Sequence, residues 1–189
     1  MNRSQQLALG ALSLALGLSS CLPCHGAFVD YFLKIERIEG ESQDAAYVGY
    51  CRILSFSWGI HQSAGVTQSK GLTITKELDK ASPKLMEACA GGSHLPRVTL
   101  IGRRIEGENQ VEFLRIVMTD VLVSSVNFNF SKIEHPPAGL DGNPNMGDKG
   151  IEEVSFNFSI IEAFYQETDS GGAPVGDIVE GMVWLPLTP

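Results

Sequence analysis

The sequence of 189 residues lacks the short motifs that mark common catalytic sites. It contains no HExxH zinc motif, no GxSxG nucleophile turn and no glycine-rich phosphate loop. Its four histidines are scattered, and no two are spaced four residues apart, as paired metal ligands on one helical face would be. We therefore predict no catalytic residue and no cofactor.

Positive charge is also sparse and unclustered. The chain has 14 Lys and Arg against 22 Asp and Glu, which gives a formal net charge of −8 at pH 7. Nucleic-acid phosphates and anionic membrane surfaces both attract proteins through concentrated basic patches. The sequence therefore argues against nucleic acid as a partner and against electrostatic docking on a membrane.

Long hydrophobic runs are absent except near the N-terminus. Leu7 to Leu18 is an unbroken run of Leu, Ala, Gly and Ser, preceded by Arg3 and followed by small residues. This order predicts a secretory signal peptide over residues 1–26, because the run is too short for a comfortable membrane span. A buried helix is the alternative, but the run has no polar face. We expect an exported protein, periplasmic or secreted, whose mature chain has no integral membrane segment.

Two processing sites fit this leader. Cleavage after Gly26 would place small residues, Cys24 and Gly26, at both recognition positions. Residues 18–21, Leu-Ser-Ser-Cys, instead resemble a lipobox, in which Cys21 would become a lipidated N-terminus. In either case residues 27–189 are long enough for a single domain with its own core.

Cysteine is scarce as well. Two of the four cysteines, Cys21 and Cys24, belong to the leader, and no βαβ pattern surrounds them as around a redox CxxC motif. Cys51 and Cys89 could form a disulfide in an oxidising compartment, which would add about 3 kcal/mol of stability. Two buried free thiols are the alternative, because the sequence provides no distance between them.

Most of the chain after the leader has the pattern of β-strands. Apolar side chains alternate with small or polar ones, as on half-buried strands, within 31–36, 54–60, 72–75, 98–101, 113–130, 154–161 and 178–185. The stretch 113–130 contains two strand-like runs, and a change of parity at Ile160–Ile161 predicts a bulge. Gln62 to Gly71 has the composition of a polar loop. We predict an all-β fold, a barrel built from two antiparallel sheets.

One short helix interrupts the strands at about residues 82–90. Ser82 is predicted to cap its first turn, and Pro83 follows where a missing N–H costs nothing. Leu85 and Cys89 lie one turn apart on an apolar stripe. Gly91–Gly92 is predicted to end the helix, because glycine readily adopts the left-handed conformation.

Residues 74–100, ITKELDKASPKLMEACAGGSHLPRVTL, resemble the central segment of the haemolysin-coregulated protein (Hcp) family, the tube subunits of bacterial type VI secretion. Three further blocks agree in order: ILSFSWGI at 53–60, FLRIVMTDVLVSSV at 113–126 and VSFNFSIIEAFY at 154–165. The resemblance implies an Hcp-like β-barrel in residues 27–189, and homo-oligomers in which hexameric rings stack into a tube. It also implies other type VI components and small effector proteins as partners.

Three features depart from that family. The usual tube subunit is loaded from the cytoplasm without a leader. The loop at 62–71, which is commonly a longer projection that helps one ring engage the next, looks short here. The tail WLPLTP at 184–189 replaces a polar, lysine-bearing one.

Two alternatives to a ring subunit follow from the sequence. One is an extracytoplasmic Hcp-like binding protein that has diverged from the tube role, and the leader supports it. The other is a cell-envelope hydrolase, because some family members carry fused enzyme domains. Residues 171–189 are too few for such a domain, so we predict that the protein is not an enzyme.

One stretch resembles a calcium-binding loop in the spacing of its oxygen-bearing residues. Its oxygen-bearing residues have the spacing of EF-hand ligands and are Asp141, Asn143, Asn145 and Glu152. However, Met146 occupies the position of the sharp-turn glycine, and Pro144 stiffens the middle. A turn-rich loop explains Asn, Gly and Pro equally well. We predict no metal site, with these four residues as the candidate should one exist.

Overall fold

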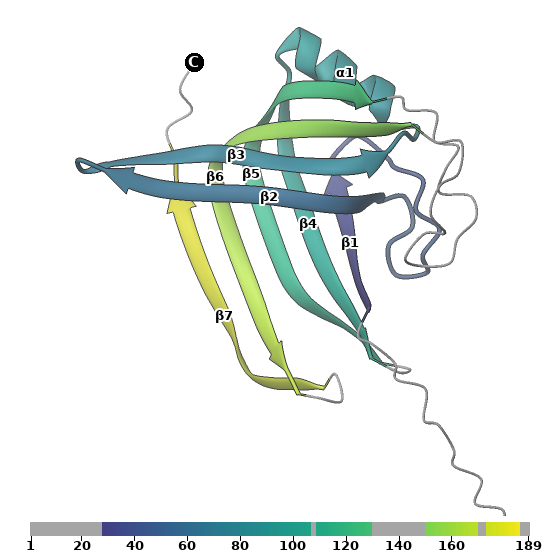
Figure 1. Ribbon diagram of the computed structural model, residues 1–189, viewed down its shortest axis with the longest axis vertical. Coiled ribbons are helices and arrows are strands. Elements are labelled where there is room, and N and C mark those ends of the chain that lie inside the picture. Colours follow the sequence, from purple (N-terminus) through teal and green to yellow (C-terminus); the bar gives the residue numbers. More distant parts are fainter. Residues whose placement is uncertain (1–27, 107–108, 130–149, 170–172, 186–189) are drawn as a thin grey trace, which may run out of the picture.

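The computed structural model describes residues 28–106, 109–129, 150–169 and 173–185. In this part of the chain the elements are β1 (Phe28–Ile35), β2 (Cys51–Ser63), β3 (Val66–Glu77), α1 (Ser82–Gly91), β4 (His94–Glu106), β5 (Asn109–Asn129), β6 (Ile151–Thr168) and β7 (Pro174–Trp184). Figure 1 shows their arrangement, with α1 at one end of the strands. The predicted all-β fold with one short helix is confirmed.

The strands form one antiparallel sheet rather than the predicted two. Their order is β3-β2-β1-β4-β5-β6-β7, and β3 also pairs with β6, which closes every strand except β7 into a barrel. The 18-residue β6 makes this possible: its first half pairs with β3, with Leu72 opposite Phe156, and its second half pairs with β7. Similarly, the two runs predicted within 113–130 belong to one strand, β5.

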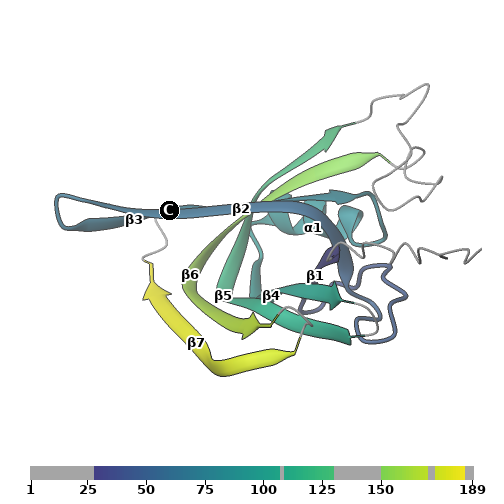
Figure 2. The same ribbon diagram turned by 60° about the horizontal axis from the view of Figure 1, so that its bottom comes forward.

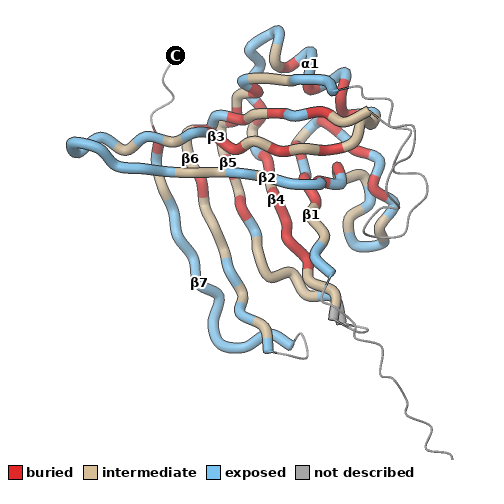
Figure 3. Tube along the Cα trace, in the orientation of Figure 1, coloured by how far each residue is buried: buried red, intermediate tan, exposed pale blue. Residues whose placement is uncertain are grey.

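The barrel interior is a continuous apolar core. Its buried side chains come from all six strands of the barrel and from the helix, and include Leu33, Leu72, Leu100, Met118, Phe156 and Leu85. Figure 3 shows these buried segments around the barrel, whereas β7 is pale along nearly its whole length. Burial of each such side chain contributes about 1.5–3 kcal/mol, so the core stabilises the barrel and holds α1 against it.

A crease runs across β5 and β6 where a bulge was predicted. Met118 and Val121 in β5 are both buried although they are three residues apart, and so are their partners in β6, Ile161 and Phe158. The pairing of the two strands continues in register across this point. Asp120 lies between the two buried positions with a left-handed φ of 54°. The change of parity is therefore real, but it arises from this backbone kink and not from an inserted residue.

The segment predicted as a polar loop, Gln62 to Gly71, is instead part of a β-hairpin. β2 continues to Ser63 and β3 begins at Val66. Ala64 and Gly65 form the turn with φ values of 51° and 80°, both positive, as in the type I′ turns of tight hairpins. Figures 1 and 2 show this hairpin extending beyond the barrel, and we call residues 60–69 the arm. The loop prediction was wrong because these polar residues pair through their backbones and bury little, so no apolar alternation marks them.

Candidate assembly surfaces

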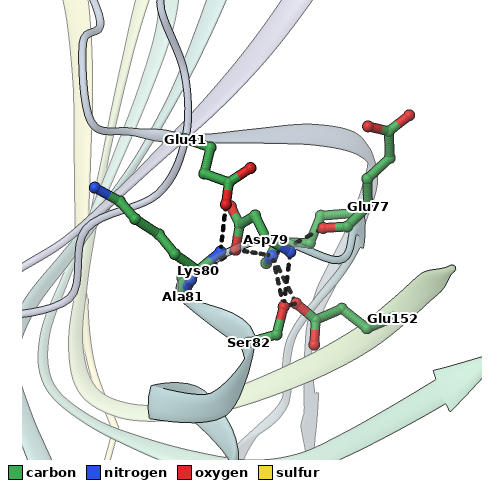
Figure 4. Close-up of polar contacts among 8 residues, drawn as sticks. Glu41, Glu77, Asp79, Lys80, Ala81, Ser82 and Glu152 are labelled. Atoms are coloured by element: carbon green, nitrogen blue, oxygen red, sulfur yellow. Dashed lines mark hydrogen bonds and ion pairs between the residues drawn. The ribbon is translucent and has the colours of Figure 1, made fainter. Parts of the chain in front are cut away.

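The junction between α1 and the barrel is held by a buried polar cluster (Figure 4). Lys76 Nζ lies 2.6 Å from Asp79 Oδ1 and 2.6 Å from Glu152 Oε1, and the side chains of Lys76 and Glu152 are both 0% exposed. Burial acts to lower the pKa of Lys76, but its hydrogen bonds to Asp79 and Glu152 prevail and raise the pKa. The lysine therefore stays charged inside the protein and ties the β3–α1 connection to β6.

Ser82 belongs to this cluster and does not cap the helix as predicted. The N-cap residue is Ala81, and no side chain caps the first turn. The Ser82 hydroxyl donates to Glu152 Oε1 at 2.7 Å and accepts from the Asp79 amide at 3.0 Å. The capping prediction was wrong because a buried carboxylate from β6, far away in sequence, competes for the hydroxyl. The predicted Pro83 position and the glycine ending, with Gly92 at a φ of 60°, are confirmed.

The two cysteines of the barrel are free thiols, Cys51 buried and Cys89 half-buried. Burial raises the pKa of the Cys51 thiol to about 12, and the nearby Asp79 charge acts in the same direction. Cys51 is therefore an unreactive core thiol at neutral pH. A disulfide between Cys51 and Cys89 stays a prediction about the oxidised protein.

The structure describes only one of the four candidate calcium ligands. Asp141, Asn143 and Asn145 lie outside the described residues, while Glu152 is bound to Lys76 and Ser82. Within the described ranges, no three His, Cys, Asp or Glu side chains converge on a position that could hold a metal ion. The absence of a metal site stays a prediction, and a calcium ion at the candidate loop would have to compete with Lys76 for the Glu152 carboxylate.

His94, Asp120 and Ser159 meet at the crease but are not arranged as a catalytic triad. His94 Nδ1 lies 2.6 Å from Asp120 Oδ1, and the Ser159 hydroxyl donates to Asp120 Oδ2 at 2.6 Å. Serine and histidine thus both contact the carboxylate and not each other, so no base activates the hydroxyl. The Ser159 and His94 hydrogen bonds lower the pKa of Asp120, which favours a charged, structural carboxylate that holds the kinked strand.

β7 is an open edge of the sheet. Within the described part of the chain it pairs only with β6, so its other backbone edge carries unpaired N–H and C=O groups. All its residues except Val183 are exposed. Its large apolar side chains stand on both faces, with exposed fractions of 61% for Ile178, 67% for Val179, 54% for Met182 and 71% for Trp184. An apolar strand exposed in this way is typical of a surface that another chain covers.

A second open edge lies at the start of β1, which is separated from β7 by β4, β5 and β6 in the same sheet. β1 pairs with β4 along its length, but with β2 only from Tyr31 to Leu33. Phe28 to Asp30 therefore have a free backbone edge among the described strands, and Phe28 is 58% exposed. The molecule thus has two different strand edges that remain to be covered.

The arm is the third exposed surface. Trp58 at its base donates a hydrogen bond from Nε1 to Ser69 Oγ at 3.2 Å, which ties β2 to β3. An open groove lies at its base, and the lining of this groove includes Trp58, Ile60, His61 and Lys70. Neither the arm nor the β7 edge was assigned from the sequence. A usable signal was the Ala64-Gly65 turn between two stretches of strand-forming residues.

Three comparisons bear on these surfaces. The family described as "Type VI secretion system effector, Hcp" matches residues 32–165. The chain belongs to the Hcp family. Protein hcp1 of Pseudomonas aeruginosa is 36% identical over 162 residues, covering 80% of this chain and 92% of that protein.

Solved structures of Hcp proteins share the fold. Hcp1 from Salmonella typhimurium superposes with a TM-score of 0.64 at 29% identity, covering 82% of this chain and 94% of that one. A type VI secretion system effector from Yersinia pestis has a TM-score of 0.63 at 25% identity, covering 82% of this chain and all of that one. The predicted family is therefore confirmed.

Membership in the Hcp family makes this chain a tube or ring subunit of type VI secretion and not an enzyme. Hcp proteins are secreted through that system and act in oligomeric assemblies with its other components. No helix in the described part of the chain is both long and apolar enough to cross a membrane.

Proposed function

We propose that this Hcp-family subunit closes into hexameric rings by joining the β7 edge of one copy to the β1 edge of the next. The exposure of β7 on both faces and along its free backbone carries the proposal. The contact joins two different surfaces, and such heterologous contacts generate rings when the rotation closes. A neighbouring strand would pair the free N–H and C=O groups and cover the apolar side chains.

The arm supports the second level of assembly, the stacking of rings into a tube. Because it extends beyond the barrel, it can reach a subunit that does not share the sheet (Figure 2). Its polar strands need no partner to stay soluble. Its groove with Trp58 and Ile60 provides apolar contact area for a stacked neighbour. The hollow of such a tube would hold small effector proteins.

The sequence before the barrel supports export. The apolar run of Leu7 to Leu18 after Arg3 is what a secretory leader requires, so residues 1–26 would be removed and residues 27–189 would form the mature barrel domain. The mature protein would then reach the periplasm or the exterior. Mass spectrometry of the mature N-terminus tests this step: a chain starting at Ala27 supports cleavage, a lipidated Cys21 supports the lipobox, and an intact Met1 contradicts export by the leader.

Size-exclusion chromatography with multi-angle light scattering tests the ring. The mature chain should elute at six times the subunit mass, and negative-stain images should show rings, with stacks at high concentration. A chain that stays monomeric up to about 1 mM, roughly a thousandfold above the micromolar dissociation constant of a modest interface, would contradict the ring. That result would favour the alternative of an extracytoplasmic Hcp-like binding protein.

A further inference from the structure

The outward face of the sheet has a charge polarity from one end to the other. Strand register aligns side chains into rows across the sheet, because directly paired antiparallel residues share a face. One row runs through Lys34, Thr99, Val117, Glu162 and Met182. The next runs through Arg52, Phe32, Ile101, Arg115, Phe164 and Glu180. Both rows begin with a cation near the β1 end and carry a carboxylate near the β7 end.

The β6–β7 end of the sheet is rich in carboxylates. Residues 151–189 contain seven Asp and Glu and no Lys or Arg. Glu180 is exposed on the edge strand itself, and Glu162 is half-buried on β6 one row away. Neither carboxylate has an ion-pair partner within the described ranges. We call Glu162 and Glu180 the acidic flank.

The opposite end carries cations. Lys34 and Arg97 are exposed and line one depression between β1 and β4, and we call these two residues the basic flank. Lys34 Nζ lies 5.8 Å from the centroid of the Tyr50 ring, and neither cation has an ion-pair partner among the residues described. Arg115 in the same depression is already bound by Glu112, at 2.6 Å. Glu36 is the one acid in the depression, so the basic flank keeps a net positive charge.

We infer that the acidic flank of one copy docks against the basic flank of a second copy, so that charge sets the head-to-tail polarity of the assembly. This inference rests on the proposed self-association and names the surfaces that direct it. β1 and β7 run parallel in one sheet with three strands between them, so a second copy in the same orientation can bring its acidic flank toward the basic flank. Carboxylates then meet cations at each junction.

The same charges disfavour the competing arrangement. Two copies could also pair β7 with β7, which would close a dimer and stop further assembly. That pairing would bring the acidic flank, together with Asp177 on the same strand, against its own copy. Like charges facing each other across an interface oppose binding and suppress wrong partners. The polarity therefore selects the heterologous contact that a ring requires.

Charge-reversal variants of the full mature chain test the inference by light scattering. K34E alone, and E162K/E180K alone, should raise the concentration needed for half-assembly about tenfold or more near 50 mM salt, where surface charges are weakly screened. The combined variant K34E/E162K/E180K restores opposite charges and should recover most of the assembly. K84E is the matched control, because Lys84 is an exposed cation on α1 that belongs to neither flank, and it should assemble as the unmodified chain does.

The outcomes separate this inference from the proposed function. An unmodified chain that stays monomeric overturns the proposed ring. An unmodified chain that assembles, with reversal variants assembling equally well, overturns the charge polarity alone. Salt provides a second readout with opposite signs: added salt should weaken assembly of the unmodified chain and strengthen that of K34E. An identical salt response for both would also overturn the inference, and circular dichroism verifies that each variant is folded.

Discussion

Lys76 is the residue on which the helix junction depends. It neutralises two carboxylates, Asp79 and Glu152, in a place that water does not reach. Glu152 Oε2 is buried without a hydrogen-bond partner among the described residues, so this carboxylate relies on Oε1 and its contacts with Lys76 and Ser82. Buried charges are tolerated only when they are paired, because desolvation costs several kcal/mol per ion.

Replacing Lys76 with Met should therefore destabilise the protein strongly. Met keeps the length of the side chain but removes the charge, which leaves two buried carboxylates unpaired. We expect a loss of about 3–5 kcal/mol in the free energy of unfolding, measured by urea denaturation at pH 7. Lys84→Met removes an exposed pair with Glu87 and should leave the free energy of unfolding nearly unchanged. Equal losses in the two variants would contradict this account of the cluster.

Arg103 plays a comparable role on the other side of the barrel. Its guanidinium is 5% exposed, lies 2.7 Å from Asp44 and 2.9 Å from Asp30, and stacks on the rings of Phe32 and Tyr47. These contacts attach the β1–β2 connection to β4. The hydrogen bond from Arg103 is the main cause that lowers the pKa of Asp44.

This lowered pKa predicts a specific acid sensitivity. The pKa of Asp44 is lower in the folded protein than the ordinary value of 3.8, so the stabilisation from Asp44 is fully present above about pH 4 and is lost as pH falls through the folded pKa. Asp44→Asn should cost about 1–3 kcal/mol in urea unfolding at pH 7, and the difference from the unmodified protein should shrink near pH 2.5. Asp177→Asn, at an exposed position, should change little at either pH. A difference for Asp44→Asn that stays constant between these pH values would refute the assignment.

Among the elements, the arm depends on a glycine where it leaves the barrel. Gly71 has a φ of 72°, and a Cβ at this position would lie 2.7 Å from the Phe156 carbonyl oxygen. The backbone of β3 can therefore approach β6 closely only without a side chain. This approach is what allows β3 to pair with β6 on one side of Gly71 and to project as the arm on the other.

Gly71→Ala should therefore cost more than the left-handed conformation alone. That conformation accounts for about 1–2 kcal/mol, and the contact with the β6 backbone adds to it, so we expect a loss above about 2 kcal/mol. Gly65→Ala at the turn of the arm is the matched control, because Gly65 has a φ of 80° with open space around it. It should cost about 1 kcal/mol. Similar thermal-unfolding shifts for the two variants would show that β6 does not constrain Gly71.

At the scale of the whole molecule, the most unusual feature is β7, an apolar strand that stays exposed in the part of the chain that the structure describes. β7 contributes little to the core, and only Val183 at its end packs against it. Its side chains therefore stabilise the single subunit little. They gain burial only when another subunit covers them.

The substitution Trp184→Ser distinguishes the contribution of β7 to the stability of one subunit from its contribution to assembly. Trp184 is 71% exposed, so its loss should leave the stability of the subunit nearly unchanged. Buried aromatic residues at an interface contribute about 2–4 kcal/mol, so assembly should weaken by at least tenfold in light scattering. Met86→Ser removes a comparably exposed apolar side chain from α1 and should leave assembly unchanged. Assembly by Trp184→Ser at the same concentration as the unmodified protein would place the interface elsewhere.

The sequence by itself determined what depends on near neighbours. Alternation predicted most of the strands, Pro83 and the paired glycines bounded the one helix, and the ordered blocks around residues 74–100 identified the family. Each signal is local, because strand faces repeat every two residues and helix ends are decided by the residues beside them.

Only the tertiary structure decided what depends on distant pairs. Ser82 was predicted to cap the helix, but its hydroxyl donates a hydrogen bond to Glu152 of β6 instead. Gln62 to Gly71 was predicted as a loop, but backbone pairing of β2 with β3 extends it as the arm. The candidate surfaces arose in the same way: β7 is exposed because only β6 pairs with it among the described strands, and the charge rows exist because five strands in one row and six in the other align in register. Local sequence cannot encode these features, because each depends on which strand the folded chain places alongside.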